Sequence, residues 1–281
     1  MQNPKDIVVY IDAEGRVSWR AVIDHAVRLA TTWNSHVVIA FAPEDLVLRP
    51  HTGFVRGAAI HATIASHEER KQIAKEELQT ILAEVEATTG VSCELRICTG
   101  QTGEALMLHA RHASLAVVAA SRSTDRDVTA LTLAEDVIFA SGRPSMLIPA
   151  DWRTNGMPSK IVIGWNASRE AARAVADSIP FLLGAEAVHV VVVPEPKNSG
   201  LLGEDPGADI SRHLAHYGVK VVLDRLEGPN AGELILERAE EIGANMIVMG
   251  AYGQSRITEF VFGSATRTLF ARASIPILLS R

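Results

Sequence analysis

Four residues in the last part of the chain have types and a spacing that suit the binding of a phosphate group. Gly250, Gly253, Gly263 and Ser264 form the pattern G-x2-G-x9-G-S, which directly follows the apolar run 246–249. Glycines allow a sharp turn and a close approach of the backbone to a ligand, because they lack a Cβ atom. The Gly-Ser pair opens a predicted helix, and the free N–H groups of a first helical turn attract anions. The pattern therefore predicts a strand that leads into a phosphate-holding loop, and the ligand it suggests is a nucleotide.

The elements that must position this loop are apolar runs of strand length alternating with helical segments. Continuous Val, Ile and Leu strands of this kind indicate a parallel sheet that helices cover on both faces. We predict an α/β fold with two tandem doubly wound domains, each a five-stranded parallel sheet with helices on both faces. The runs assigned to strands are 7–12, 37–41, 92–98, 115–120, 145–149, 161–166, 188–193, 246–249 and 276–280. In such sheets ligands bind at the carboxyl ends of the strands, where the strand order reverses, and the glycine loop follows such an end.

The second half of the chain repeats the first. The runs 7–12 and 161–166 both end in a small polar acceptor and precede a helical segment, and the segment 100–106 resembles 228–234. A chain of 281 residues exceeds the usual size of one domain. We therefore predict an N-terminal domain over 1–150, a linker with Gly and Pro over 151–159, and a C-terminal domain over 160–281.

Two segments of the chain show local sequence signals of their structure. Residues 44–66 have no counterpart in the second half and are interpreted as a surface insertion, which a helix over 68–85 follows. In the second half, Asn230 and Glu233 fit a capping box. The helix that they begin places Ile235, Ala239 and Ile242 on one apolar face.

Composition excludes several classes of protein. The formal net charge is −6 and neither half is basic, so nonspecific binding to nucleic acid is not expected. No leader-like segment opens the chain, and no apolar stretch approaches the roughly 18 residues that a membrane span needs, so we expect a cytoplasmic protein. The two cysteines, Cys93 and Cys98, are five residues apart in a predicted strand. Their side chains then lie on opposite faces, which indicates two structural thiols.

The sequence lacks the motifs of several common enzyme classes. The sequence has no GK dipeptide, no G-x-G-x-x-G and no G-x-S-x-G, which disfavours a Walker A loop, dinucleotide redox chemistry and a serine hydrolase. The pairs His213/His216 and His109/His112 have helical spacing but no evident third ligand, and we interpret them as surface histidines. We predict no catalytic residue and no metal site.

These residues resemble the universal stress protein family in its tandem form, with two family domains in one chain. The resemblance covers nearly the whole sequence, and its most specific part is the complete signature at Gly250, Gly253, Gly263 and Ser264. The resemblance implies the adenine nucleotide alpha hydrolase-like fold. It also implies ATP as the ligand, with or without Mg²⁺, because members with this signature typically bind ATP.

The resemblance assigns a role to each part of the site. Gly250 and Gly253 would let the loop close over the ribose and the phosphates. The end of the first strand of the second half would contact the nucleoside, and the main chain near Val192 would read the adenine edge. The residues implied to bind the nucleotide are Trp165, Asn166, Val192, Gly250, Gly253, Arg256, Gly263, Ser264 and Ala265.

The chain departs from the family pattern at two places. Asn166 stands where the family usually has Asp, so an amide replaces the charge that helps to hold a divalent ion or a ribose hydroxyl. In the first half the corresponding loop, 120–129, has no glycine, and Asp125 and Asp127 would repel a phosphate. Asp12 keeps the strand-end carboxylate, but we predict that the first half binds no ATP.

The expected function is a stress-response regulator or sensor whose C-terminal domain binds ATP with little or no turnover. The loop offers only Glu259 and Arg256 for hydrolysis, with no motif to orient them. The resemblance also implies that the two halves dock through their fifth strands as an intramolecular pseudo-dimer, with a homodimer as a further step. Two alternatives stay open: a module that binds a small ligand or a protein partner without ATP, and a slow ATPase.

Overall fold

The computed structural model describes residues 3–12, 16–43, 57–98, 108–120, 138, 141–153, 156–194, 204–251 and 264–281. Its first half contains β1 (Asp6–Asp12), α1 (Arg16–Trp33), β2 (His36–Ala42), α2 (Gly57–Thr89), β3 (Cys93–Ile97), β4 (Leu115–Ala119) and β5 (Ser145–Ile148). Its second half contains β6 (Lys160–Trp165), α5 (Arg169–Leu182), β7 (Ala187–Val192), α6 (Ala208–His216), β8 (Val221–Arg225), α7 (Ala231–Glu241), β9 (Met246–Gly250), α8 (Ser264–Arg272) and β10 (Ile277–Ser280).

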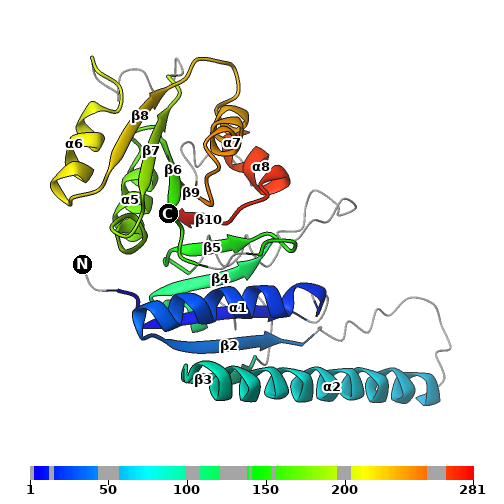
Figure 1. Ribbon diagram of the computed structural model, residues 1–281. Coiled ribbons are helices and arrows are strands. Elements are labelled where there is room, and N and C mark those ends of the chain that lie inside the picture. The colour runs from blue at the N-terminus through cyan, green and yellow to red at the C-terminus, as the bar shows by residue number, and fades with distance from the viewer. Residues whose placement is uncertain are drawn as a thin grey trace.

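The strands of both halves form one ten-stranded sheet in the order β3-β2-β1-β4-β5-β10-β9-β6-β7-β8 (Figure 1). Within each half every pair of neighbouring strands is parallel, as the fold prediction requires. The halves meet where β5 and β10 pair antiparallel, with Leu278 opposite Met146. β1 lies between β2 and β4, and β6 lies between β7 and β9. The strand order therefore reverses beside β1 and beside β6.

Helices cover both faces of this sheet. In the second half α5 and α6 lie on one side of the strands, and α7 and α8 lie on the other (Figure 1). Buried residues of α1, α2 and α5 form one continuous apolar cluster with the strands of both halves. A second cluster fills the opposite face beneath α7 and α8. Because the sheet is buried on both sides, its inner strands are apolar at nearly every position, whereas the edge strands β3 and β8 are partly exposed and carry charged residues.

The nine predicted strand ranges agree with the structure to within one residue or so, and β8 (Val221–Arg225) had no predicted range. The helix predicted over 68–85 is wrong at its start, since α2 begins at Gly57, within the segment interpreted as an insertion. From 61 to 70 nearly every side chain is exposed, so the helix has no apolar stripe there for periodicity to detect. Cys93 packs in one apolar cluster and Cys98 in the other, which confirms their opposite faces.

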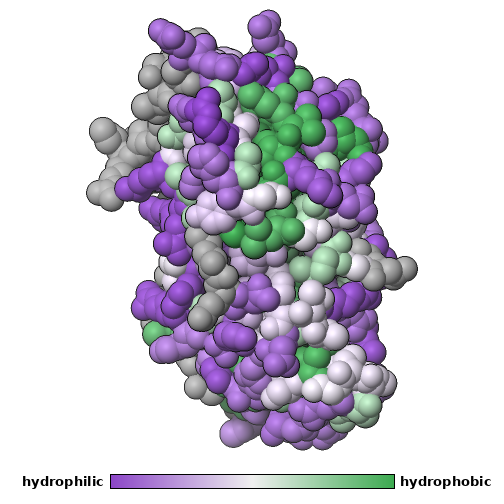
Figure 2. Space-filling view, turned by 60° about the vertical axis from the view of Figure 1, so that its left-hand side comes forward, coloured by the Kyte–Doolittle hydropathy of each residue, from purple (hydrophilic) through white to green (hydrophobic). Residues whose placement is uncertain are grey.

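The surface differs between the two halves. On the face in Figure 2 hydrophobic residues gather in the upper part, which the C-terminal half occupies, and the lower part is mainly hydrophilic. Among the helices that the structure describes, none combines the length and the apolar character needed to cross a membrane.

Candidate functional site

Three of the sequence-predicted site residues lie together at the carboxyl edge of the second half. Trp165 ends β6 and is in register with Val192, which ends β7. Gly250 ends β9, the neighbour of β6 on the other side. This is the point at which the strand order reverses, and open α/β sheets bind ligands there.

The turn after β6 uses its polar side chains to begin α5. The Asn166 Oδ1 atom accepts a hydrogen bond from the Ser168 N–H at 3.1 Å, and Ala167 between them has a positive φ of 57°. Ser168 is the N-cap of α5, because its Oγ accepts from the Ala171 N–H at 3.1 Å. With its oxygen engaged, Asn166 offers its NH₂ group to a ligand. Residue 166 is therefore a hydrogen-bond donor here and not a carboxylate.

Gly250 lies against the first turn of α5. A Cβ atom added at Gly250 would lie 2.5 Å from the Ala171 nitrogen and 2.6 Å from the Glu170 carbonyl carbon. These are backbone atoms, which cannot move aside as the tip of a side chain can. The sequence assigned this glycine to ligand approach, and the structure adds a second reason for it: β9 can end here only if residue 250 has no side chain.

The first turns of α7 and α8 lie side by side at the same edge. Because α8 connects the parallel strands β9 and β10, its first residue, Ser264, lies at their carboxyl end. A Cβ at Gly232 of α7 would lie 2.9 Å from the Cα and the carbonyl oxygen of Ala265. Phosphate oxygens at this edge would therefore meet helix N-termini, which attract anions.

The predicted N-cap of α7 is confirmed. The Asn230 Oδ1 accepts from Gly232 N at 3.1 Å and from Glu233 N at 3.4 Å. The carboxylate of Glu233 forms an ion pair with Arg272 of α8. Glu233 therefore fastens α7 to α8 next to Gly232.

The end of β7 is covered on the α6 side. Gly207, with a φ of 88°, approaches so closely that a Cβ there would lie 2.8 Å from the Val192 Cγ2 atom. The Val192 carbonyl accepts from Leu226 N at 3.0 Å. The Val192 side chain is buried, and its carbonyl already accepts one hydrogen bond. A nucleotide base at this edge would therefore bind to the second lone pair of that carbonyl or to the main chain of Val193.

Part of the predicted site lies outside the described residues. Gly253, Arg256 and Gly263 fall there, as do Tyr252, Glu259 and Phe262 of the same loop. The first-half loop, 121–129, with Asp125 and Asp127, also falls outside. At the end of the site that is predicted to hold the phosphates, the described residues are Gly250, Ala265 and the start of α8.

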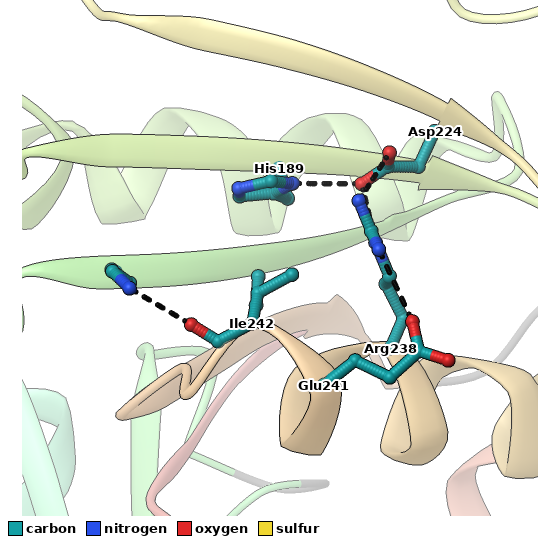
Figure 3. A network of polar contacts seen from close by, with 6 residues as sticks. His189, Asp224, Arg238, Glu241 and Ile242 are labelled. Atoms are coloured by element: carbon teal, nitrogen blue, oxygen red, sulfur yellow. Dashed lines mark hydrogen bonds and ion pairs between the residues drawn. The ribbon is translucent and has the colours of Figure 1, made fainter.

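A polar network that the sequence did not indicate ties α7 to the outer strands (Figure 3). Asp224 of β8 contacts His189 Nδ1 of β7 at 2.8 Å and receives two hydrogen bonds from Arg238 of α7, at 2.9 and 3.0 Å. Burial acts to raise the pKa of the Asp224 carboxyl, but the hydrogen bonds from Arg238 and His189 outweigh it and the pKa is lowered. The three residues come from separate elements, so no local spacing could have revealed the network. Asp224 is the last residue but one of β8, and His189 lies in the middle of β7.

His213 and His112, one from each predicted histidine pair, each have a contact within the protein. His213 packs edge-on against Tyr217, with ring centroids 5.3 Å apart, and a His112 ring nitrogen contacts the Leu108 carbonyl at 2.8 Å. Within the described part of the chain, no group of three or more His, Cys, Asp or Glu side chains is arranged to hold a metal ion.

Comparison with known proteins gives a family match for the second half of the chain. Residues 157–281 match the model of the Universal stress protein family. The chain is 27% identical to universal stress protein Slr1230 of Synechocystis over 157 residues, 52% of this chain and 50% of that protein. It is 44% identical to stress response protein NhaX of Bacillus subtilis over 89 residues, 32% of this chain and 53% of that protein. The chain thus spans about half the length of the curated relatives it matches.

A solved structure resembles the whole fold. A universal stress protein from Archaeoglobus fulgidus covers 98% of both chains with a TM-score of 0.73 and 18% sequence identity. At that identity the likeness shows the fold alone. Together with the family match, it defines the class: residues 157–281 match the Universal stress protein family in sequence, and the whole chain has the fold of a universal stress protein.

Proposed function

We propose that the C-terminal half of this universal stress protein binds ATP at the carboxyl ends of β6, β7 and β9. The observation that carries the proposal is the start of α8, which lies beside the first turn of α7 at the point where the strand order reverses. Two adjacent helix N-termini favour a highly charged anion such as a triphosphate. The glycine signature between β9 and α8 supplies the loop that would cover it.

The described residues fit the nucleoside as well. The NH₂ group of Asn166 can donate to a ribose oxygen, and Trp165 and Val192 end the two strands beside it. Ser264 and Ala265 open α8, where backbone N–H groups can hold phosphate oxygens. We assign Gly253, Arg256 and Gly263 to the phosphates on the sequence signature.

The proposed role is regulatory, with little or no turnover. Phosphates at the start of α8 would change the contact between Ala265 and Gly232 of α7. Near its other end, α7 is bound through Arg238 to Asp224 of β8, which also contacts His189 of β7. Occupancy of the site would therefore bias the position of α7 and α8. A stress-response sensor needs such a dependence of conformation on a ligand.

Thermal denaturation with millimolar ATP tests this proposal. A ligand at 100 times its dissociation constant adds about 2.7 kcal/mol to the stability of the protein that binds it. We expect ATP to raise the melting temperature, and Gly263→Val to abolish this rise by placing a branched side chain where phosphate should lie. Ser123→Val, in the first-half loop without glycine, is the matched control and should keep the full effect. An unchanged wild-type melting curve would contradict ATP binding, and equal loss in both variants would contradict the assignment to the C-terminal half.

A further inference from the structure

We propose that two copies of this protein pair through the free edge of β8, strand against antiparallel strand, about a two-fold axis at Val222. The ten-stranded sheet has two edge strands, β3 and β8. The last strands of the two halves, β5 and β10, already pair with each other at its centre. Neither of them therefore offers a free edge to a second copy. The inference does not depend on nucleotide binding.

Alternate residues of β8 turn their main-chain groups away from β7. The Lys220 carbonyl, just before the strand, accepts a hydrogen bond from Val188 N of β7 at 2.9 Å. Because main-chain groups alternate in direction along a strand, those of Val221 and Leu223 point outward. No main-chain hydrogen bond joins these outward groups to another described residue. Such an edge is a template for the addition of another strand.

The other edge strand, β3, is better protected against pairing. The Cys93 N–H at its start donates to the Glu86 side chain of α2 at 3.3 Å. Glu94 and Arg96, which form an ion pair, place charges inside the strand. Charged side chains within an edge strand oppose its pairing with another chain. The first three residues of β8 carry no charge, so β8 is the edge that favours association.

Hydrophobic side chains are exposed at the β8 edge. Val222 is 42% exposed although it lies inside a strand, and Tyr217, at the end of α6 just before β8, is 40% exposed. Figure 2 shows that hydrophobic residues gather on the surface of the same half. Apolar side chains beside unpaired main-chain groups can be buried together by one added strand.

The sequence of β8 suits pairing with a second copy of itself. In an antiparallel pair centred on Val222, the two copies of this residue lie directly opposite each other, in a non-hydrogen-bonded pair where side chains are closest. Val221 then faces Leu223, and their outward main-chain groups form the hydrogen bonds. The exposed Lys220 faces Asp224, an acidic residue. Apolar pairs and opposite charges both stabilise neighbouring strands. A register centred on Leu223 would instead set Val222 against Asp224.

Sedimentation equilibrium without nucleotide, over a range of protein concentrations, tests the inference. The edge has only five residues, so we expect a weak dimer that dissociates in the micromolar range. Val222→Lys sets two like charges opposite each other and should weaken association by about tenfold or more, and Val222→Glu should do the same. An equimolar mixture of the two variants should restore the dimer, because lysine then faces glutamate.

Two controls separate association from folding. Val222 is exposed, so each variant should keep the wild-type melting temperature. Leu183→Lys is the matched control, because Leu183 is another exposed hydrophobic residue of the second half, at the end of α5 and outside β8. It should associate as the wild type does.

Each other result overturns the inference. A wild type that is monomeric at every concentration shows that β8 does not pair with a second copy. A dimer that survives Val222→Lys must use another surface. If the two variants stay monomeric when they are mixed, residue 222 does not face its own copy and the two-fold axis is wrong.

Discussion

At the scale of single residues, the missing side chain of Gly250 is what lets β9 end against α5. The space that a Cβ would need is filled by backbone atoms of Glu170 and Ala171. The same residue begins the loop proposed to hold phosphates. A substitution there therefore disturbs packing and the candidate site together.

Gly250→Ala tests this contact. We expect a loss of about 2 to 3 kcal/mol in the free energy of unfolding, because neither β9 nor α5 can give way cheaply. Denaturant unfolding of the variant measures it. Gly184→Ala is the control, since the nearest atom to a Cβ there is 3.9 Å away, and it should change stability by less than about 0.5 kcal/mol. Equal effects from the two variants would contradict the close approach.

His25 in α1 makes the stability of the protein depend on pH. Both ring nitrogens are buried without a hydrogen-bond partner in the described structure. Burial, together with the nearby charge of Arg28, lowers the pKa of His25 to about 4. In the unfolded chain the pKa is about 6.5. As the pH falls from 6.5 towards 4, the unfolded state gains a proton that the folded state does not, so stability is lost in that window.

We therefore expect His25 to cost the wild type about 2 kcal/mol of stability between pH 7 and pH 5. Unfolding curves at the two pH values measure this loss. His25→Leu should remove about that much of the pH dependence and keep its stability at pH 7. A variant as sensitive to acid as the wild type would show that other groups are responsible.

At the scale of elements, α7 is held at both ends. Gly232 and Glu233 bind its first turn to α8, and Arg238 binds its later turns to Asp224 and through it to His189 (Figure 3). Helix α7 therefore connects the start of α8 with the outer strands of the sheet. Through it, a change at the proposed phosphate site would reach β8.

Asp224→Ala should lower the free energy of unfolding by about 2 to 3 kcal/mol, because it leaves Arg238 and His189 without their shared carboxylate. A double-mutant cycle with Arg238→Ala should give a clear coupling energy. Asp209→Ala, which breaks an exposed ion pair with Arg212, is the comparison and should have almost no effect. Additive effects of Asp224→Ala and Arg238→Ala would contradict the network.

These elements also show where sequence reasoning succeeds. The inner strands could be predicted because burial on both faces makes them continuously apolar, and the N-cap at Asn230 is a local signal. The edge strand β8 was given no range, because it is partly exposed and ends in Asp224 and Arg225. The start of α2 could not be predicted, because exposed turns have no apolar period. The packing of Gly250 against Glu170 and the contact of Gly232 with Ala265 depend on elements that meet only after folding. The candidate site was therefore predicted in its strand ends and not in its helix contacts.

At the scale of the whole molecule, the two halves share one sheet and one apolar cluster. β5 and β10 pair at its centre, and Trp33 of α1 packs edge-on against Phe181 of α5 with ring centroids 4.7 Å apart. Both rings are buried. The halves therefore support each other, although we propose that only the second binds a nucleotide.

We expect the wild type to unfold in one transition, with the same midpoint by circular dichroism and by fluorescence. Trp33→Ala should lower the free energy of unfolding by about 3 to 5 kcal/mol, since it removes a large buried ring. If the halves unfold separately in the wild type, the shared cluster does not couple them.

The central claim concerns one nucleotide in one half, and the stoichiometry of ATP binding tests it most directly. Calorimetric titration of the wild type should give one ATP per chain, and Gly263→Val should give none. Two ATP molecules per chain, or one that survives Gly263→Val, would contradict the assignment of the site to the C-terminal half.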